Sequence, residues 1–194
     1  MDLHAEAMKR FHEEFARAAT VGLREPTAMT LATAGRDGRP SVRTVLLKEA
    51  DERGFVFYTN LESRKGRHLA ENARAALCFH WPPMEKQVIV EGATALVSDA
   101  EADAYWKSRP RDSQIGAWAS RQSRPLARRE ELLERVDEVA KKYAGKDVPR
   151  PPHWTGVRVA PDRIEFWTAM PYRLHDRTVY EKAGGAWTKT LAFP

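Results

Sequence analysis

The stretch that decides the fold runs from residue 28 to residue 59 and reads AMTLATAGRDGRPSVRTVLLKEADERGFVFYT. Short apolar and β-branched segments alternate in it with two turn sequences, Gly35-Arg36-Asp37-Gly38 and Asp51-Glu52-Arg53-Gly54. This spacing predicts strands over 28–34, 41–49 and 55–59 that are joined by tight connections. Neighbouring strands joined in this way pair antiparallel.

The rest of the chain adds strands and helices without a regular β-α-β alternation. Further strands are predicted over 74–81, 86–97, 155–160, 163–168, 173–181 and 186–192. Helices are predicted over 3–20, 64–72, 98–108, 112–120 and 125–143. This order favours a mainly β fold in which helices surround a closed antiparallel sheet.

The Pro-rich loop over 145–153 is the best candidate for a domain boundary. The segment after it is too short to fold alone, so we expect a single domain over 1–194. In that domain, residues 1–25 form an N-terminal helix, and residues 145–194 supply strands that complete the same sheet.

Composition excludes several classes of protein. Of 194 residues, 42% are hydrophobic, with six Trp and seven Phe, which is too apolar for a disordered chain. No apolar run approaches the roughly 18 residues of a membrane helix. The acidic start, Met1 to Glu6, does not resemble a signal peptide, and the single Cys78 cannot form an intrachain disulfide. We therefore expect a cytoplasmic protein.

The net charge of +5 is compatible with an anionic partner. The basic residues recur in short clusters mixed with acids, which fits discrete phosphate sites slightly better than a broad nucleic-acid face. On charge alone, an ordinary solvated basic surface is the favoured interpretation. The phosphate-loop, dinucleotide, GxSxG and HExxH motifs are absent, and the six His show no ligand spacing, so we expect no metal site.

Three basic clusters are candidate anion sites. One runs from Arg43 to Lys48 and is followed by Tyr58-Thr59. In the second, Ser63 caps a helix whose first turn carries Arg64 and Lys65. These cations oppose the helix dipole unless an anion binds beside them. The third, Ser108 to Trp118, combines two arginines with two hydroxyl groups. For each cluster, a solvated polar surface is the alternative interpretation.

Strand parity leads to two further expectations. In a strand over 173–181, Arg173, His175 and Arg177 share one face, where the two cations keep the imidazole neutral and able to bond a pyridine or phenol. The alternative is a solvent-facing polar row. Parity also places Arg43 and Lys48 on opposite faces. Both then serve one site only if the strand is bulged, or if they serve different ligands or different subunits.

Taken together, six motifs resemble those of the pyridoxine/pyridoxamine 5'-phosphate oxidases, from about Pro26 to the C-terminus. They are RTVLLK (43–48), FYTNL (57–61), SRK (63–65), SRPRDSQIGAW (108–118), IEFW (164–167) and RLHDR (173–177). The resemblance implies an FMN-binding split β-barrel and a homodimer with FMN at the subunit interface. The implied reaction oxidises pyridoxine 5'-phosphate and/or pyridoxamine 5'-phosphate with oxygen. Its products are pyridoxal 5'-phosphate, hydrogen peroxide and, from the amine, ammonia.

The resemblance also implies roles for individual residues. The implied FMN contacts are Arg43, Thr44, Val45, Leu46, Leu47, Lys48, Tyr58, Thr59, Arg64, Lys65, Gln87, Gln122, Ser123, Trp167 and Arg177. The implied contacts of the substrate phosphate are Lys48, Tyr105, Arg109 and Ser113. Arg173 and His175 lie over the pyridine ring in this pattern and are the implied catalytic residues.

The chain departs from the family pattern at Thr168 to Tyr172, where Pro171 replaces part of a Gly-rich stretch. The family's basic N-terminal arm is also short or missing. The first departure motivates one alternative, a related split-barrel flavin oxidase that acts on another aromatic substrate of the phenazine type. A basic nucleic-acid-binding module is the third hypothesis. The leading one includes neither nucleic acid nor a membrane as a partner.

Overall fold

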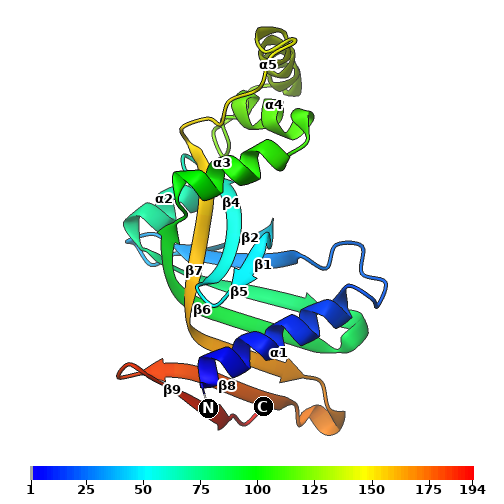
Figure 1. The fold of residues 1–194 in the computed structure, drawn as a ribbon, viewed down its shortest axis with the longest axis vertical. Coiled ribbons are helices and arrows are strands. Elements are labelled where there is room, and N and C mark those ends of the chain that lie inside the picture. Colours follow the sequence, from blue (N-terminus) through cyan, green and yellow to red (C-terminus); the bar gives the residue numbers. More distant parts are fainter. Residues whose placement is uncertain (1) are drawn as a thin grey trace.

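Nine strands form one antiparallel sheet in the computed structural model, which describes residues 2–194 (Figure 1). The strands are β1 (Ala28–Ala34), β2 (Pro40–Leu46), β3 (Glu49–Asp51), β4 (Gly54–Asn60), β5 (Arg74–Trp81), β6 (Lys86–Leu96), β7 (Trp154–Thr168), β8 (Asp176–Ala183) and β9 (Ala186–Leu191). The sheet order is β2-β1-β5-β6-β7-β4-β3, and β8 and β9 extend it from β7.

Five α-helices accompany the sheet in the described residues. They are α1 (Leu3–Ala18), α2 (Arg64–Glu71), α3 (Asp99–Ser108), α4 (Arg111–Ala119) and α5 (Arg129–Lys142). Figure 1 shows α3, α4 and α5 stacked at one end of the molecule, while α1 and both termini lie at the other end. None of the helices in the described part of the chain has the length and apolarity needed to cross a membrane.

The central strand β7 is longer than the sequence predicts. Two strands with a break near residue 161 were expected, but one strand runs through. Its register against β6 shifts between Glu91, which pairs with Arg163, and Gly92, which pairs with Pro161. Asp162 is thus the extra residue of a β-bulge, and a bulge tolerates a proline that has no N–H to donate. β7 can therefore pair with β4 near its start and with β8 near its end.

The main core lies between the sheet and α1. Phe11 of α1 is fully buried and makes edge contacts with Phe55 and Phe79. The polar edge of the same helix is anchored to the sheet by an ion pair between Glu14 and Lys86. The amphipathic helix expected at the N-terminus is confirmed, and its buried face packs in the main core.

A second, smaller core joins the helices to the barrel. It contains Trp106, Ile115, Val148 and Trp154. The helix predicted from Pro125 begins only at Arg129, so that prediction was wrong in its start. All side chains from 121 to 130 are exposed, and another helical turn there would bury no apolar surface.

Candidate functional site

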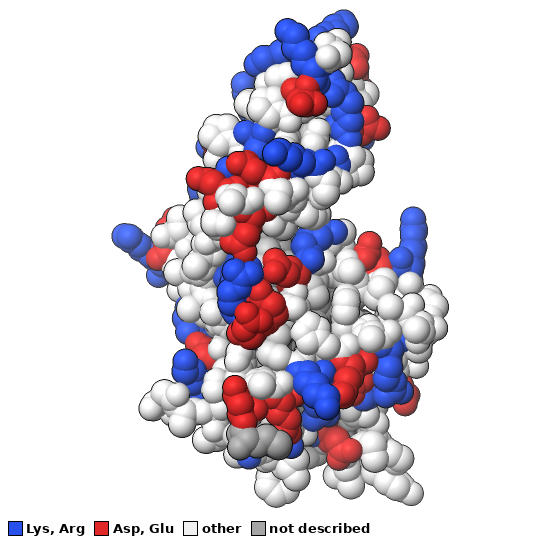
Figure 2. Space-filling model, in the orientation of Figure 1, with Lys and Arg blue, Asp and Glu red and all other residues white. Residues whose placement is uncertain are grey.

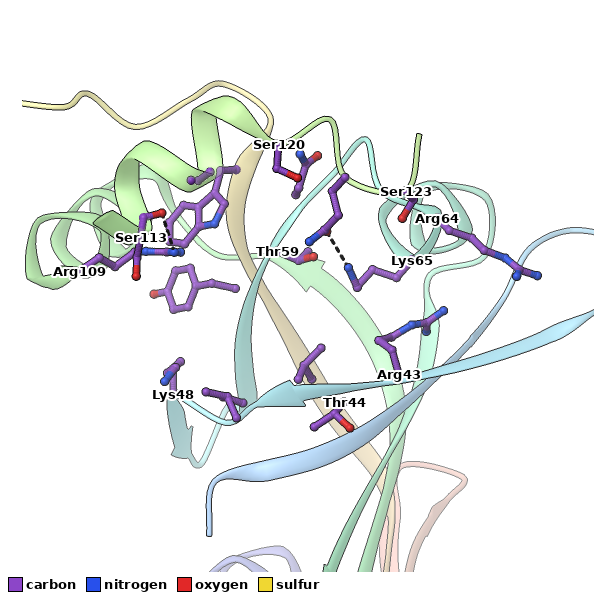
Figure 3. Close-up of a pocket in the computed structure, with 18 of the residues that line it drawn as sticks. Arg43, Thr44, Lys48, Thr59, Arg64, Lys65, Arg109, Ser113, Ser120 and Ser123 are labelled. Atoms are coloured by element: carbon purple, nitrogen blue, oxygen red, sulfur yellow. Dashed lines mark hydrogen bonds between the residues drawn. The ribbon is translucent and has the colours of Figure 1, made fainter. Parts of the chain in front are cut away.

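A cavity of about 920 Å³ opens between the barrel and the helices. Its walls come from β2, β4, the start of α2, the segment from Tyr105 to Ala117 and the connection that carries Gln122 (Figure 3). This volume lies near the upper end of the roughly 300–1,000 Å³ that small-molecule sites occupy. The cavity can therefore accept a ligand as large as a cofactor.

The cations of this cavity have no acidic partners among the described residues. Elsewhere, arginines such as Arg158, Arg163 and Arg177 form ion pairs with carboxylates. Within residues 2–194, no carboxylate lies at ion-pairing distance from the basic side chains that line the cavity, which are Arg43, Lys48, Arg64, Lys65 and Arg109. The site therefore concentrates uncompensated positive charge, which favours an anionic ligand.

Arg43 is held by neutral groups. Its guanidinium donates to the Leu31 carbonyl at 3.1 Å, to Thr33 Oγ1 at 2.7 Å and to Ser41 Oγ at 2.7 Å. These acceptors fix the side chain without neutralising it. Burial, and next the charge of Arg64, lower the pKa of Arg43.

Lys65 completes this end of the cavity. Its ammonium donates to Gln122 Oε1 at 2.8 Å (Figure 3). It also donates to Ser63 Oγ at 3.2 Å. Burial, and then the charge of Arg43, lower the pKa of Lys65 to about 8. Ser63 also caps α2 by accepting from the Gly66 N–H, and the first turn of α2 contains no acid. The predicted capped helix with opposing cations is confirmed.

The other end of the cavity is built around Arg109. This residue precedes α4, and its guanidinium donates to the Ser113 carbonyl at 3.2 Å. Burial lowers the pKa of Arg109. Figure 3 shows Arg109, Ser113 and Lys48 on one side of the cavity, and Arg43, Arg64 and Lys65 on the other. The cavity thus has two separate cationic ends.

Lys48 reaches the cavity because the strand before it is shorter than predicted. The expected strand over 41–49 ends at Leu46, and β3 starts at Glu49. The backbone N–H of Leu47 donates to the Thr27 carbonyl beside β1, whereas that of Lys48 donates to the Val56 carbonyl of β4, each at 2.8 Å. The chain thus changes its pairing partner between β2 and β3, and the alternation of a single strand does not extend from Arg43 to Lys48. Arg43 and Lys48 therefore line the same cavity of one chain.

Most of the predicted site residues line this cavity. They are Arg43, Thr44, Val45, Leu46, Lys48, Tyr58, Thr59, Arg64, Lys65, Tyr105, Arg109, Ser113, Gln122 and Ser123. Leu47 instead packs in the main core, with 5% of its surface exposed. Sequence reasoning missed other lining residues, among them Asn60, Ser120 and Trp154. Trp154 follows the Pro-rich loop, but the sequence alone does not show which strand it joins.

The remaining predicted residues form a second group outside the cavity. Trp167 of β7 is the register partner of Gln87 on one side and of Arg177 on the other. The His175 ring lies 4.6 Å from the Trp167 ring, between ring centres. Arg173 lies in the short segment between the end of β7 and the start of β8. We call Gln87, Trp167, Arg173, His175 and Arg177 the β7 row.

The expected strand over 173–181 was wrong at its start. Pro171 opens a 3₁₀ turn, and Tyr172 and Arg173 both have positive φ, at 58° and 62°. This left-handed conformation is uncommon for residues other than glycine and breaks the strand pattern. β8 begins only at Asp176, so 173, 175 and 177 do not share a strand face.

The β7 row nevertheless carries defined interactions. Arg177 donates to Glu165 at 2.7 Å, and this contact raises the pKa of Arg177. His175 Nδ1 lies 3.2 Å from the Met170 backbone N–H, which donates to it. Because Nδ1 accepts this bond, Nε2 carries the ring proton and can donate to a ligand.

The sheet and its cavity define the class of protein, an antiparallel split barrel, as two solved structures show. PhzG from Burkholderia lata 383, in complex with tetrahydrophenazine-1-carboxylic acid, superposes with a TM-score of 0.90 and 35% identity. The alignment covers 96% of this chain and 91% of that one. A pyridoxamine 5'-phosphate oxidase-related, FMN binding protein from Nostoc punctiforme PCC 73102 shares the fold, with a TM-score of 0.75 and 17% identity. That alignment covers 94% of this chain and 96% of the other.

The chain belongs to the pyridoxamine 5'-phosphate oxidase family, whose profile matches residues 15–168. Residues 154–194 match the pyridoxine 5'-phosphate oxidase C-terminal dimerisation region. A pyridoxine/pyridoxamine 5'-phosphate oxidase of Myxococcus xanthus (strain DK1622) is 59% identical, over 97% of this chain and 92% of the relative. A protein of the same name from Alkalilimnicola ehrlichii (strain ATCC BAA-1101 / DSM 17681 / MLHE-1) is 57% identical over the full length of both. The family and fold expected from the motifs are confirmed.

Proposed function

We propose that the protein is an FMN-dependent oxidase of pyridoxine 5'-phosphate and pyridoxamine 5'-phosphate. The observation that carries the proposal is the cavity with two cationic ends and no carboxylate partner among the described residues. Two phosphorylated ligands that bind together need two such ends. The names of the relatives that are 59% and 57% identical support the same substrates.

FMN fits the end that contains Arg43, Arg64 and Lys65. A phosphate there would receive charge-assisted bonds from three cations that no carboxylate of the described residues neutralises. Gln122 already contacts Lys65, and Ser123 lines the same end, so both are suited to hold the cofactor. When bound, FMN supplies the two-electron chemistry, taking electrons from the substrate and passing them to oxygen to yield hydrogen peroxide.

The substrate phosphate fits the end that contains Arg109. Lys48, Tyr105 and Ser113 surround this end and offer an ammonium and two hydroxyl groups. The start of α4 adds backbone N–H groups and the positive end of a helix dipole. These groups would hold the phosphate while the pyridine ring extends toward the cofactor.

Arg173 and His175 are proposed to orient the pyridine ring, although neither lines the cavity of its own chain. We therefore infer a homodimer in which the β7 row of one subunit completes the cavity of its partner. Three exposed apolar side chains near the end of the chain, Leu174, Leu191 and Phe193, support this arrangement. The match of residues 154–194 to a dimerisation region supports it as well.

Phenazine-type oxidation is the second candidate, favoured by the superposition on PhzG and by the 3₁₀ turn at Pro171 beside Arg173. For a nucleic-acid-binding module, the surface offers less support. Acidic and basic side chains are intermixed over most of the face in Figure 2.

We further infer that the protein acts in the cytoplasm, which fits a chain with one cysteine.

The test is the absorbance spectrum of freshly purified protein during an anaerobic titration. We expect a yellow protein whose flavin band bleaches with pyridoxine 5'-phosphate or pyridoxamine 5'-phosphate. Admission of oxygen should restore the band and release hydrogen peroxide. A flavin band that neither compound bleaches would favour the phenazine-type candidate. A colourless protein that binds no added FMN would contradict both.

A further inference from the structure

Arg109 rests on aromatic rings and not on an acid. Its guanidinium carbon lies 4.6 Å from the centre of the Trp154 ring and 5.5 Å from that of Trp106. Its Nε is buried and has no hydrogen-bond partner in the described structure. Among the described residues, the guanidinium makes one hydrogen bond, the donation to the Ser113 carbonyl.

An aromatic support has a different effect from a carboxylate. A carboxylate would occupy the N–H groups of the guanidinium and cancel its charge, so an incoming phosphate would have to displace it. An aromatic face attracts the cation through its quadrupole and leaves both the charge and the N–H groups available. Arg109 is thus placed without being neutralised.

Trp154 is itself rigidly held. Only 4% of its surface is exposed. The Tyr58 ring stacks on it at 5.1 Å between ring centres, and the Trp106 ring meets it edge to face at 4.9 Å. Trp106 is fixed in turn, since its indole N–H donates to the Val148 carbonyl at 2.7 Å. The support under Arg109 is therefore part of the second core.

We propose that Trp154 is a positioning residue that holds the Arg109 guanidinium in place for the substrate phosphate. The proposal rests on the proposed function for the identity of the substrate. The placement of a phosphate group by Arg109 can be tested separately, because inorganic phosphate serves as a probe that needs no turnover.

The experiment compares Trp154→Leu with Trp154→Phe in the FMN-loaded protein. Leucine removes the aromatic face, and we expect KM for pyridoxine 5'-phosphate to rise roughly tenfold while kcat changes by less than about twofold. Phenylalanine keeps a face with a weaker quadrupole, so the rise should be smaller. Binding of inorganic phosphate, followed by ³¹P line broadening, should weaken in the same order. Trp81→Leu is the matched control, because Trp81 is equally buried but lies in the main core.

A double-mutant cycle separates positioning from packing. If Trp154 acts through Arg109, adding Trp154→Phe to Arg109→Ala should cause no further loss of phosphate affinity. Additive losses would overturn the proposal, as would an unchanged KM in a folded Trp154→Leu protein or an equal rise in Trp81→Leu. Trp154→Phe keeps the cycle usable if the leucine variant does not fold. If neither the wild type nor any variant oxidises pyridoxine 5'-phosphate or pyridoxamine 5'-phosphate, the proposed function fails. The titration with inorganic phosphate still decides the role of Trp154.

Discussion

At the scale of single residues, the cavity derives its character from cations that are held by neutral or aromatic groups. Thr33 and Ser41 hold Arg43, Gln122 holds Lys65, and Trp154 supports Arg109. Because these acceptors are neutral, the electrostatic potential in the cavity stays positive. An anionic ligand can therefore neutralise charges that only water solvates in its absence. Because Lys65 is partly buried and close to Arg43, its charge also makes the site sensitive to pH.

Lys65 is expected to make FMN binding depend on pH. Its pKa of about 8 in the ligand-free cavity means that the ammonium is present below that pH and lost above it. A bound phosphate favours the charged form, so FMN affinity should fall as the pH rises above about 8. Quenching of FMN fluorescence by the apoprotein measures this affinity. Lys65→Arg stays charged throughout and should flatten the profile. An equally steep profile in that variant would assign the titration to another group.

Arg173→Ala is expected to separate turnover from cofactor binding. Arg173 lies outside the cavity that is proposed to hold FMN, so the variant should purify with a full complement of flavin. Loss of a group that orients the substrate ring should lower kcat/KM by on the order of 10²-fold. The Arg64→Ala/Lys65→Ala double variant should show the opposite behaviour, because it should lose the flavin itself. Full activity of Arg173→Ala would remove Arg173 from the proposed substrate site.

At the scale of secondary-structure elements, α2 depends on one close approach. A Cβ added at Gly66 would lie 2.1 Å from the Leu61 carbonyl oxygen, a backbone atom that cannot move aside cheaply. The absence of a side chain there lets the first turn of α2 pack against the end of β4. Arg64 and Lys65 owe their positions in the cavity to this packing.

Gly66→Ala is therefore expected to weaken FMN binding and to lower the thermal midpoint of unfolding. The added methyl group must push α2 away from Leu61 and carry both cations with it. Gly116→Ala serves as a control for stability alone, because a Cβ there meets no atom within 4 Å. Because Gly116 lies inside α4, Gly116→Ala should leave the thermal midpoint unchanged or raise it. Alanine stabilises a helix by about 0.5–1 kcal/mol relative to glycine. An FMN affinity of wild-type strength in Gly66→Ala would show that the positions of Arg64 and Lys65 do not depend on this close approach.

Local sequence patterns predicted the elements well wherever local chemistry dominates. The strand over 28–34, the capping box at Ser98 and Glu101, and the helix capped by Ser63 all match the structure. The predictions failed where long-range pairing or a turn decides. Proline at 161 is absorbed by a bulge because β6 pairs across it, and the turn at Pro171 removes the strand geometry expected at Arg173.

At the scale of the whole molecule, most of the residues that the motifs indicated line one cavity, but the residues of the β7 row lie apart from it. Strand pairing places the β7 row on β6, β7 and the segment around the start of β8, whereas the cavity is built on β2, β4 and the helices. No local pattern reports such a separation, because it follows from sheet order. That the chain folds as a single domain stays a prediction.

The separation leads to a complementation test of the proposed dimer. An Arg64→Ala/Lys65→Ala subunit has a defective cavity and an intact β7 row, and an Arg173→Ala subunit has the converse. Each is expected to be nearly inactive alone. In a mixed dimer, the intact cavity of one subunit meets the intact row of the other, so one of its two sites should work.

Co-refolding equal amounts of the two variants should therefore restore about a quarter of the wild-type activity, since random pairing makes half of the dimers mixed and half of their sites intact. The control places all three substitutions in one chain and mixes it with the wild type. Its mixed dimers then contain no intact site, and about a quarter of the activity should remain, against about a half if each site lay within one chain. A mixture of the two single-defect subunits that stays inactive would show that the β7 row does not serve the partner's cavity.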